Sequence, residues 1–417
     1  MATPVVAART VMPVPTVTPG APEGTDGTPA DAPAAIATAA ETVWRADLAA
    51  VFRKYHTLGA VVCVIQNGAV AYTACYGARD LDGAPMTADT LFRVGSISKM
   101  VTGIGLMRLV EEGRLSLDAD LSPLLGVPLR HPRYPDAAVT LRQLMTHTAA
   151  LRDSDAYNRA LADEVTPLSQ LFTGKLLPEQ FLSYTKPGTR SRYSNFCGGL
   201  LGCVLEAASG TTVDAWMQAE VFAPLGLTAA YQSALLPADA PVSDQYQMPG
   251  RTLGEAVRDG AAAVTEPDPQ THYTWTAGKL TLSASDLSRL LVTLCDGGVC
   301  GGKRILREDS VLAMRTLQNG IGSVTGRSNR GLCLIPQENT LVRGRTLWGH
   351  GGKANGMLCA AYFDPTDRTG VVMLTNGCDR RATYGSVGAL TVAVTRLCYT
   401  LLAQADAVRA EPWLVES

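Results

Sequence analysis

The chain has 417 residues, 46% of them apolar, and a formal net charge of −2 at pH 7. This length is enough for a large core or two domains, and 36 Lys and Arg against 38 Asp and Glu, with no basic run, argue against a nucleic-acid partner. No segment approaches the ~18 apolar residues needed to cross a bilayer, so we expect no integral membrane span. The composition leaves the oligomeric state open.

Residues 1–40 are rich in Pro, Ala, Thr and Gly and have almost no large apolar side chains. This composition predicts a disordered tether or the remnant of a leader, outside the fold. The segment lacks the basic and then apolar regions of a secretory signal. If a leader was removed, a periplasmic or secreted location is favoured over a cytoplasmic one.

Two apolar runs on either side of Asn67-Gly68 predict a β-hairpin over about 58–76. A two-residue turn places Cys63 and Cys75 on opposite faces of the sheet, so we expect both thiols to be free.

The ten cysteines lack metal-ligand spacing, because there is no C-x-x-C and the five histidines do not cluster with them. We therefore predict no metal site and no cofactor. Cys295 and Cys300 flank a turn that can bring them within bridging distance, and the sequence leaves that disulfide open.

Ser96 and Lys99 place a hydroxyl and an amine one helical turn apart, at the start of a predicted helix that ends near Gly113. Residues three apart share a helix face, and the helix N-terminus favours a developing negative charge on the serine oxygen. The pattern therefore predicts an activated serine nucleophile. The alternative interpretation is a capping serine and a solvated surface lysine.

From about 120 to 275, helical patterns are broken by Pro and Gly and strand signals are few. We interpret this stretch as a mainly helical insert. It holds a second Ser-x-x-Lys pattern, Ser183 to Lys186, which runs directly into Pro187. Because the residue before a proline is pushed out of the helical region, this second copy is predicted to be a loop.

Tyr193-Ser194-Asn195 precedes a predicted Gly- and Leu-rich helix over about 196–208. An acyl-transfer serine needs a base, a second proton carrier and an oxyanion hole. Tyr193 can take or relay the proton if a nearby Lys99 ammonium lowers its pKa from about 10. Asn195 can bond both Lys99 and a substrate carbonyl. The alternative is a capping asparagine and a packed core tyrosine.

The run from Trp348 to Lys353 is rich in glycine and precedes a predicted strand. Glycines leave the edge of a strand without side chains, so the backbone of a substrate can pair with that strand. His350 would add a donor facing the pocket, and the backbone amides of Ser96 and Lys353 could form the oxyanion hole. The alternative is a Gly-rich turn with an unrelated histidine.

Two more strands, 357–363 and 370–376, and a helix over about 384–403 complete the chain. With the first hairpin and helix they predict one antiparallel sheet covered by helices, an α/β (α+β) fold with an inserted mainly helical region. We divide the chain into a sheet domain, an insert and a tail, with the site at the junction. The boundaries are 41–120 plus 275–405 for the sheet domain, 121–274 for the insert and 406–417 for the tail.

Three ordered motifs resemble those of the penicillin-recognising serine hydrolases, the group of class C β-lactamases, DD-peptidases and related esterases. They are Ser96-x-x-Lys99, Tyr193-Ser194-Asn195 and His350-Gly351-Gly352. The flanking segments Phe92–Gly95, Thr140–Thr148, Pro187–Thr189 and Ala277–Leu280 agree, and the likeness spans about residues 45–400. The resemblance implies a β-lactamase/transpeptidase-like fold.

The resemblance also implies a two-step reaction on a small amide, D-amino-acid peptide or ester. Ser96 attacks a carbonyl while Lys99 and Tyr193 manage its proton, and water or another acceptor resolves the acyl-enzyme. The implied substrate-binding residues are Asn195, His350, Gly351, Gly352 and the backbone amide of Lys353. His147, which matches a family position on a helix, is interpreted as structural.

Class C β-lactamases have a lysine where this chain has His350, and a neutral imidazole holds a carboxylate less well. We therefore expect at most weak β-lactamase activity. A non-catalytic penicillin-binding-type sensor is the alternative. A general α/β-hydrolase is disfavoured because the chain has no G-x-S-x-G elbow.

Overall fold

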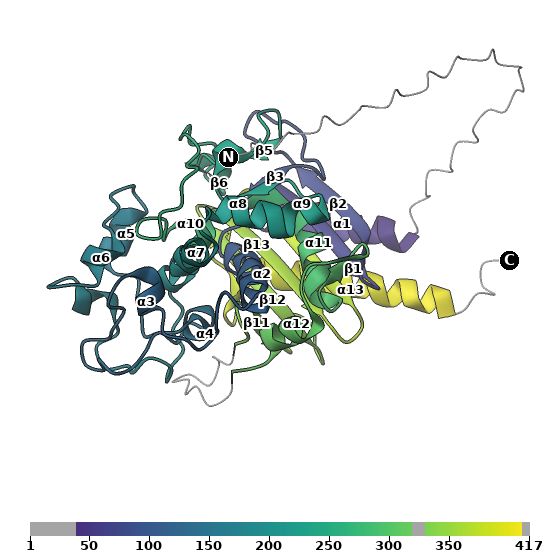
Figure 1. Cartoon of the computed structure of the whole chain (residues 1–417). Helices are drawn as coiled ribbons and strands as arrows, with labels where there is room; N and C mark the ends of the chain where they lie inside the picture. Colours follow the sequence, from purple (N-terminus) through teal and green to yellow (C-terminus); the bar gives the residue numbers. More distant parts are fainter. Residues whose placement is uncertain (1–38, 319–329, 411–417) are drawn as a thin grey trace, which may run out of the picture. The chain divides into compact units, whose positions relative to one another are not determined.

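The computed structural model describes residues 39–318 and 330–410. Its centre is a six-stranded antiparallel sheet with the order β11-β12-β13-β14-β1-β2 (Figure 1). The strands are β1 (Gly59–Gln66), β2 (Ala69–Gly77), β11 (Ile335–Glu338), β12 (Thr346–Ala354), β13 (Met357–Asp364) and β14 (Thr369–Thr375). The predicted sheet built from both ends of the chain is confirmed.

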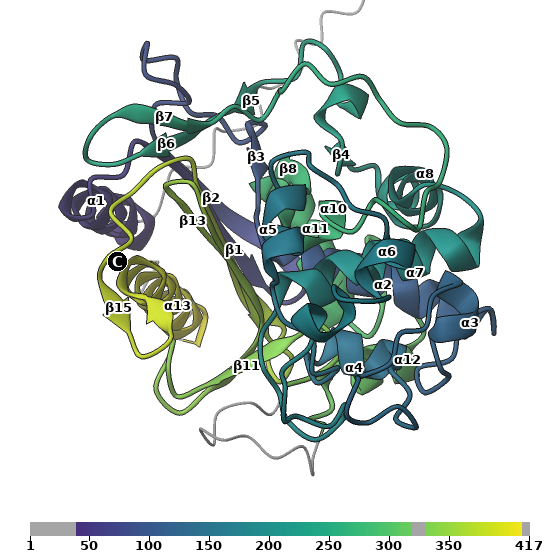
Figure 2. The ribbon, with the colours of Figure 1, turned by 90° about the vertical axis from the view of Figure 1, so that its left-hand side faces the viewer.

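Helices cover both faces of this sheet (Figure 2). Helices α1 (Ala39–Lys54) and α13 (Ala389–Ala410) pack on one face, and α2 (Ile97–Glu111) and α11 (Ala284–Cys295) pack on the other. Along β1, alternate side chains enter the two cores, so every residue of the strand is buried. This explains why β1 reads as a continuous apolar run rather than an alternating one.

The β1–β2 hairpin turns at Asn67 and Gly68, whose φ values of 53° and 75° match a two-residue type I′ turn. A register shift between Val64 and Ile65 then places Cys75 opposite Val61. Cys75 therefore lies on the same face as Cys63, and the predicted placement on opposite faces is wrong because a bulge reverses the alternation.

All ten cysteines are free in the structure, so the thiols of Cys63 and Cys75 are free as expected. The disulfide between Cys295 and Cys300 that the sequence left open is not formed.

The middle of the chain is mainly helical, as expected. Its helices are α3 (Ser122–Leu125), α4 (Leu141–Met145), α5 (Asp155–Ala160), α6 (Leu168–Leu171), α7 (Asn195–Ser209), α8 (Val213–Met217), α9 (Ala223–Leu225) and α10 (Trp275–Gly278), with 3₁₀ turns at Leu177–Gln180 and Ser233–Leu235 and a π-helical turn at Gln218–Phe222. The second Ser-x-x-Lys copy lies in a loop, as predicted.

A second, small sheet was not expected from the sequence. Its strands, in the order β4-β8-β3-β5, are β4 (Ala229–Ala230), β8 (Thr281–Ser283), β3 (Leu91–Arg93) and β5 (Val242–Ser243). A further hairpin joins β6 (Gln245–Gln247) to β7 (Thr252–Glu255). Since β3 runs directly into Ser96, this sheet ties the helical region to the start of α2, and the two regions belong to one compact unit.

The remaining elements lie between α11 and the end of the chain. They are β9 (Val299–Cys300), β10 (Lys303–Arg304), α12 (Glu308–Arg315), β15 (Thr383–Tyr384) and β16 (Val387–Gly388). The last helix begins at Ala389 rather than near 384, because Gly385 with a φ of 63° turns the chain between β15 and β16. It ends at Ala410, beyond the residue 403 expected.

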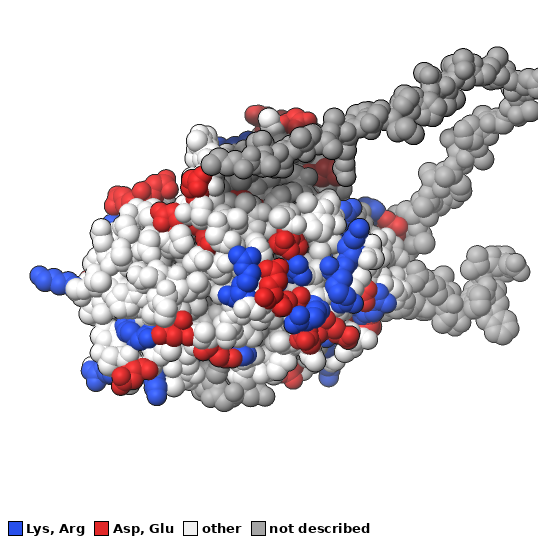
Figure 3. Space-filling model, in the orientation of Figure 1, with Lys and Arg blue, Asp and Glu red and all other residues white. Residues whose placement is uncertain are grey.

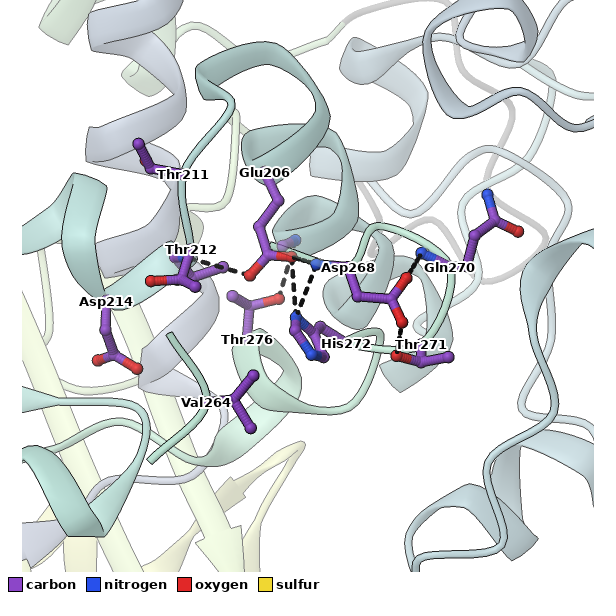
Figure 4. A network of polar contacts seen from close by, with 12 residues as sticks. Glu206, Thr211, Thr212, Asp214, Val264, Asp268, Gln270, Thr271, His272 and Thr276 are labelled. Carbon is purple, nitrogen blue, oxygen red and sulfur yellow. Dashed lines mark hydrogen bonds and ion pairs between the residues drawn. The ribbon is translucent and has the colours of Figure 1, made fainter. Parts of the chain in front are cut away.

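A buried polar network fastens α7 to the segment that leads into α10 (Figure 4). The carboxylate of Glu206 accepts hydrogen bonds from the backbone amides of Val213 and Asp268 and from Nδ1 of His272 (3.1, 2.9 and 2.9 Å). Thr276 Oγ1 in α10 donates to the Gly198 carbonyl of α7 (2.7 Å). The network sets the position of α10 relative to α7, and both helices contribute to the site described below.

On the face shown in Figure 3, Lys and Arg side chains are interspersed with Asp and Glu. No single described helix is long and apolar enough to cross a bilayer, although α7 and the segment Val213–Leu225, bent by 75° at their junction, pass that test as a pair. Within the two described ranges, no group of three or more His, Cys, Asp or Glu is placed to hold a metal ion.

Candidate active site

Ser96 lies at the N-terminus of α2, where its side chain makes no capping hydrogen bond. It is the one partly exposed residue between Leu91 and Met100. The neighbouring Ser98 makes the hydrogen bonds that stabilise this turn instead. Its hydroxyl donates to the Gly95 carbonyl and accepts from the Leu280 amide (2.6 and 3.1 Å). The capping interpretation of Ser96 is therefore wrong.

Lys99 is buried, with 1% of its surface exposed, so it is not a solvated surface lysine. Its Nζ donates to Ser96 Oγ (3.1 Å), to Asn195 Oδ1 (3.0 Å) and to the Ala277 carbonyl (2.5 Å). The Ala277 carbonyl belongs to α10, which the Glu206 network holds against α7. Three acceptors from three helices therefore fix the amine beside the serine oxygen.

Tyr193 completes the contact with Ser96, because its Oη donates to Ser96 Oγ at 2.7 Å. Lys99 Nζ lies 5.2 Å from the centre of the tyrosine ring. The ring is 37% exposed, so this residue is not a packed core tyrosine. The phenol of Tyr193 and the amine of Lys99 therefore both contact the hydroxyl of Ser96, at a partly exposed position.

Asn195 is the first residue of α7, and Ser194 rather than Asn195 caps this helix, by accepting from the Cys197 amide (3.3 Å). Asn195 Oδ1 faces Lys99, while its Nδ2 donates to Asp153 Oδ2 (3.2 Å). The expected pairing with Lys99 is therefore present.

Asp153 was missed by the sequence analysis. Its Oδ1 accepts from the Ser194 hydroxyl and the Phe196 amide (2.7 and 2.9 Å). The carboxylate orients the whole Tyr193-Ser194-Asn195 turn and fixes which atom of the Asn195 amide faces Lys99. A single acidic residue in a loop has no periodic or motif signal by which the sequence could reveal this role.

Strand β12 passes close to the serine because Gly352 has no side chain. A Cβ on Gly352 would lie 2.0 Å from the Val94 carbonyl oxygen, and the Lys353 amide nitrogen lies 3.4 Å from the Cβ position of Gly95. Strand β11 pairs with β12 only from Thr346 to Gly349. The half of β12 that contains Gly351, Gly352 and Lys353 is therefore unpaired by β11, and it faces the start of α2.

His350 is buried on β12, and its Nδ1 lies 2.6 Å from the Gly351 carbonyl oxygen. Burial, assisted by the charge of Lys99, lowers the pKa of this imidazole to about 3. The ring is therefore neutral, its proton sits on Nδ1 to donate to the carbonyl, and Nε2 is an acceptor. The expectation that His350 offers a donor to the pocket is wrong for this tautomer.

His147 lies beyond the end of α4 with a φ of 56°, not on a helix as expected. Its ring centre lies 4.4 Å from that of Tyr193, and its Nδ1 accepts from the Ser194 amide (3.4 Å). Burial, and then the charges of Arg330 and Lys99, lower the pKa of His147 well below 6.5. The neutral ring of His147 therefore packs against the ring of Tyr193.

The buried neutral state of His350 predicts a loss of stability in acid. Its folded-state pKa lies below its unfolded value of 6.5, so only the unfolded chain gains a proton as the pH falls below about 6.5. At pH 5 this linkage destabilises the native state by about 2 kcal/mol relative to pH 7.5. Urea unfolding of His350→Asn is expected to show a pH dependence smaller by about that amount. An equal dependence in both proteins would contradict the buried neutral imidazole.

Comparison with known proteins places these features in a family. A sequence model of the family described as Beta-lactamase matches residues 37–386. The chain is 32% identical over 188 residues to Esterase EstB of Burkholderia gladioli, covering 42% of this chain and 47% of the esterase, which is less than half of that relative's length. It is 26% identical over 348 residues to penicillin-binding protein 4 of Amycolatopsis lactamdurans, covering 80% and 84% of the two chains.

The fold is also found among solved structures. The D-amino acid amidase of Ochrobactrum anthropi SV3 superposes with a TM-score of 0.65 over 88% of this chain and all of the amidase, at 19% sequence identity. The family model covers most of the chain, from before α1 to β15, which confirms the resemblance carried by the three motifs. The chain belongs to the beta-lactamase family.

Proposed function

We propose that this protein is a serine hydrolase that forms a covalent acyl-enzyme on Ser96 and acts on small esters, amides or D-amino-acid peptides. The observation that carries the proposal is the meeting of Lys99 Nζ and Tyr193 Oη on one serine oxygen, at 3.1 and 2.7 Å. A serine is a weak nucleophile unless a neighbouring group takes its proton. Two candidate proton carriers within hydrogen-bond distance supply that need.

In the first step, Ser96 Oγ forms a bond to the substrate carbonyl carbon, and its proton passes to the Lys99–Tyr193 pair. The bond from that carbon to the leaving oxygen or nitrogen then breaks, and the leaving group takes up the proton. In the second step, water adds to the acyl carbon, and Ser96 regains a proton as the acid departs. An acceptor alcohol or amine in place of water would give acyl transfer.

The developing negative charge on the carbonyl oxygen needs donors. The backbone amides of Ser96 and Lys353 are our candidates, since β12 approaches the start of α2 at Gly352. A substrate backbone can pair with the half of β12 left free by β11, as a strand added to a sheet edge. Asn195, His350 and Gly351 would lie beside the substrate bound in this way.

The relatives' names support this range of substrates, since they include an esterase, a penicillin-binding protein and a D-amino acid amidase. The acceptor lone pair on His350 is poorly suited to the carboxylate of a β-lactam antibiotic. We therefore rank ester and peptide hydrolysis above β-lactam turnover.

Intact-mass spectrometry tests the proposal. The protein is incubated separately with a cephalosporin, a D-Ala-D-Ala peptide and p-nitrophenyl butyrate, and the mass of each adduct and its decay are followed. We expect an acyl adduct on the peptide that contains Ser96, decaying with product release, and no adduct in Ser96→Ala. Labelling that persists in Ser96→Ala would rule out this nucleophile. Stoichiometric labelling of the wild type with no turnover of any donor would instead indicate a sensor.

A further inference from the structure

Thr276 is a fully buried residue of α10, and it lies where α10 packs against α7 (Figure 4). Its Oγ1 donates to the Gly198 carbonyl (2.7 Å) and accepts from the Gly202 amide (3.0 Å). These two backbone groups lie four residues apart on α7, which is the spacing at which a helix bonds to itself. The hydroxyl therefore sits between a donor and an acceptor of one turn of α7, and the other three residues of α10 carry no hydroxyl.

Glycines in α7 allow the segment that ends in α10 to come this close. A Cβ on Gly202 would lie 2.9 Å from Thr276 Oγ1, and a Cβ on Gly199 would lie 1.5 Å from the Tyr273 carbonyl oxygen. A side chain at either position would push the segment away from α7. Close backbone packing and the Thr276 hydrogen bonds together fix how deeply α10 lies against α7.

The same turn of α7 holds the side chain of Lys99. A Cβ on Gly198 would lie 2.1 Å from Lys99 Cε, so the lysine stem lies directly against the residue whose carbonyl accepts from Thr276. Lys99 Nζ then donates to the carbonyl of Ala277, the residue after Thr276 (2.5 Å). One turn of α7 therefore positions both the lysine stem and the carbonyl that receives its amine.

The Ala277 carbonyl matters because it completes the hydrogen bonding of the amine. A lysine ammonium has three N–H donors, and Ser96 Oγ, Asn195 Oδ1 and the Ala277 carbonyl oxygen accept one each. A buried donor without a partner is unfavourable, and the flexible stem of a lysine lets its amine turn toward another acceptor. Displacement of the Ala277 carbonyl would therefore draw Nζ away from Ser96.

We propose that Thr276 is a positioning residue for Lys99. Its hydroxyl sets how closely α10 lies against α7, and this places the Ala277 carbonyl that directs the amine to Ser96. Within the described part of the chain, the side-chain hydrogen bonds of Thr276 all go to α7, so its effect on the serine passes through Lys99. The inference rests on the proposed function, because Lys99 belongs to the proposed proton-transfer pair.

Thr276→Val tests the proposal, because valine has the shape of threonine without the hydroxyl. The rate constant for acylation by p-nitrophenyl butyrate is expected to fall by about 10- to 100-fold, since a misplacement of about 1 Å can cost 10²-fold. The apparent dissociation constant of the ester, taken from the same burst kinetics, should change little. Thr276→Ser keeps the hydroxyl and should acylate at close to the wild-type rate. Wild-type acylation in Thr276→Val overturns the inference.

A double-mutant cycle with Lys99→Met distinguishes positioning from a general loosening of the fold. If Thr276 acts through the amine, Thr276→Val has no further effect on acylation in the Lys99→Met background. The activated ester and a high enzyme concentration make the residual rates measurable. A purely structural role would lower acylation by the same factor in both backgrounds, and that result would reject the inference.

Thr293→Val is the matched control. Thr293 is likewise fully buried, and its hydroxyl donates to a helix carbonyl, that of Arg289 in α11 (3.0 Å). Since α11 supplies none of the residues assigned to the site, this variant should acylate at the wild-type rate. An equal loss in the two valine variants would assign the effect to lost stability and would count against a positioning role.

A crystal structure of Thr276→Val separates this inference from the proposed function, because it needs no turnover. The distance from Lys99 Nζ to the Ala277 carbonyl oxygen is expected to exceed about 3.5 Å, beyond hydrogen-bond reach, and to stay short in Thr276→Ser. Displacement supports the positioning role even if labelling shows that Ser96 is not the nucleophile. An unmoved carbonyl rejects the positioning role even if esters are hydrolysed.

Discussion

Replacement of Lys99 by methionine is expected to lower kcat/KM for ester hydrolysis by about 10³-fold or more, because Ser96 loses the cationic amine that holds its oxygen and favours transfer of its proton to Tyr193. Methionine is close to lysine in length and apolar, but it leaves the Asn195 and Ala277 acceptors without their donor, which offsets the gain from removing a buried charge. A thermal melt therefore has to show that the variant is folded before its activity is compared with that of the wild type. Steady-state kinetics and a thermal melt on the same preparation measure the two effects.

The chain offers a matched control for this experiment. Lys186 ends the second Ser-x-x-Lys pattern, but it is exposed in a loop. Lys186→Met should keep wild-type activity. An active Lys99→Met enzyme would reject the lysine as a proton carrier and leave Tyr193 as the remaining candidate.

Tyr193→Phe is expected to lower kcat/KM by about 10²- to 10⁴-fold, the range typical of a lost general acid or base. The change removes only the Oη atom that lies 2.7 Å from Ser96 Oγ, and it leaves the ring contacts with His147 in place. The loss should appear in the acylation rate, followed by burst kinetics with an activated ester. Wild-type acylation in this variant would contradict a role for the phenol in proton transfer.

Tyr184→Phe is the corresponding control, since Tyr184 is 78% exposed and has no contact with Ser96. It should acylate at the wild-type rate. Comparison of the two variants separates the loss of a phenol at the site from the loss of a phenol elsewhere.

Elements that depend only on residues close together in the chain could be predicted from the sequence. The helix after Ser96 follows from the spacing of its apolar side chains, and the β1–β2 hairpin follows from the preference of Asn67-Gly68 for positive φ. The Ser96–Lys99 contact belongs to the same class, because residues three apart on a helix must share a face.

Other predictions failed where one residue or one contact changes which way a side chain faces or which ring nitrogen carries a proton. One extra residue in β2, near Val64, reverses which face Cys75 occupies, and no composition signal marks a bulge of this kind. The tautomer of His350 is decided by one contact with the Gly351 carbonyl, and burial then keeps the ring neutral. Neither contact has a counterpart in sequence spacing.

By itself, the sequence determined the residue types, their order and the local helix that brings an amine to a serine. Only the tertiary structure decided that Asp153 orients Asn195 and that Arg330 lies beside the ring of Tyr193. The reason is physical: hydrogen bonds, burial and charge depend on distances between segments far apart in the chain, and these distances exist only once the sheet and helices have packed.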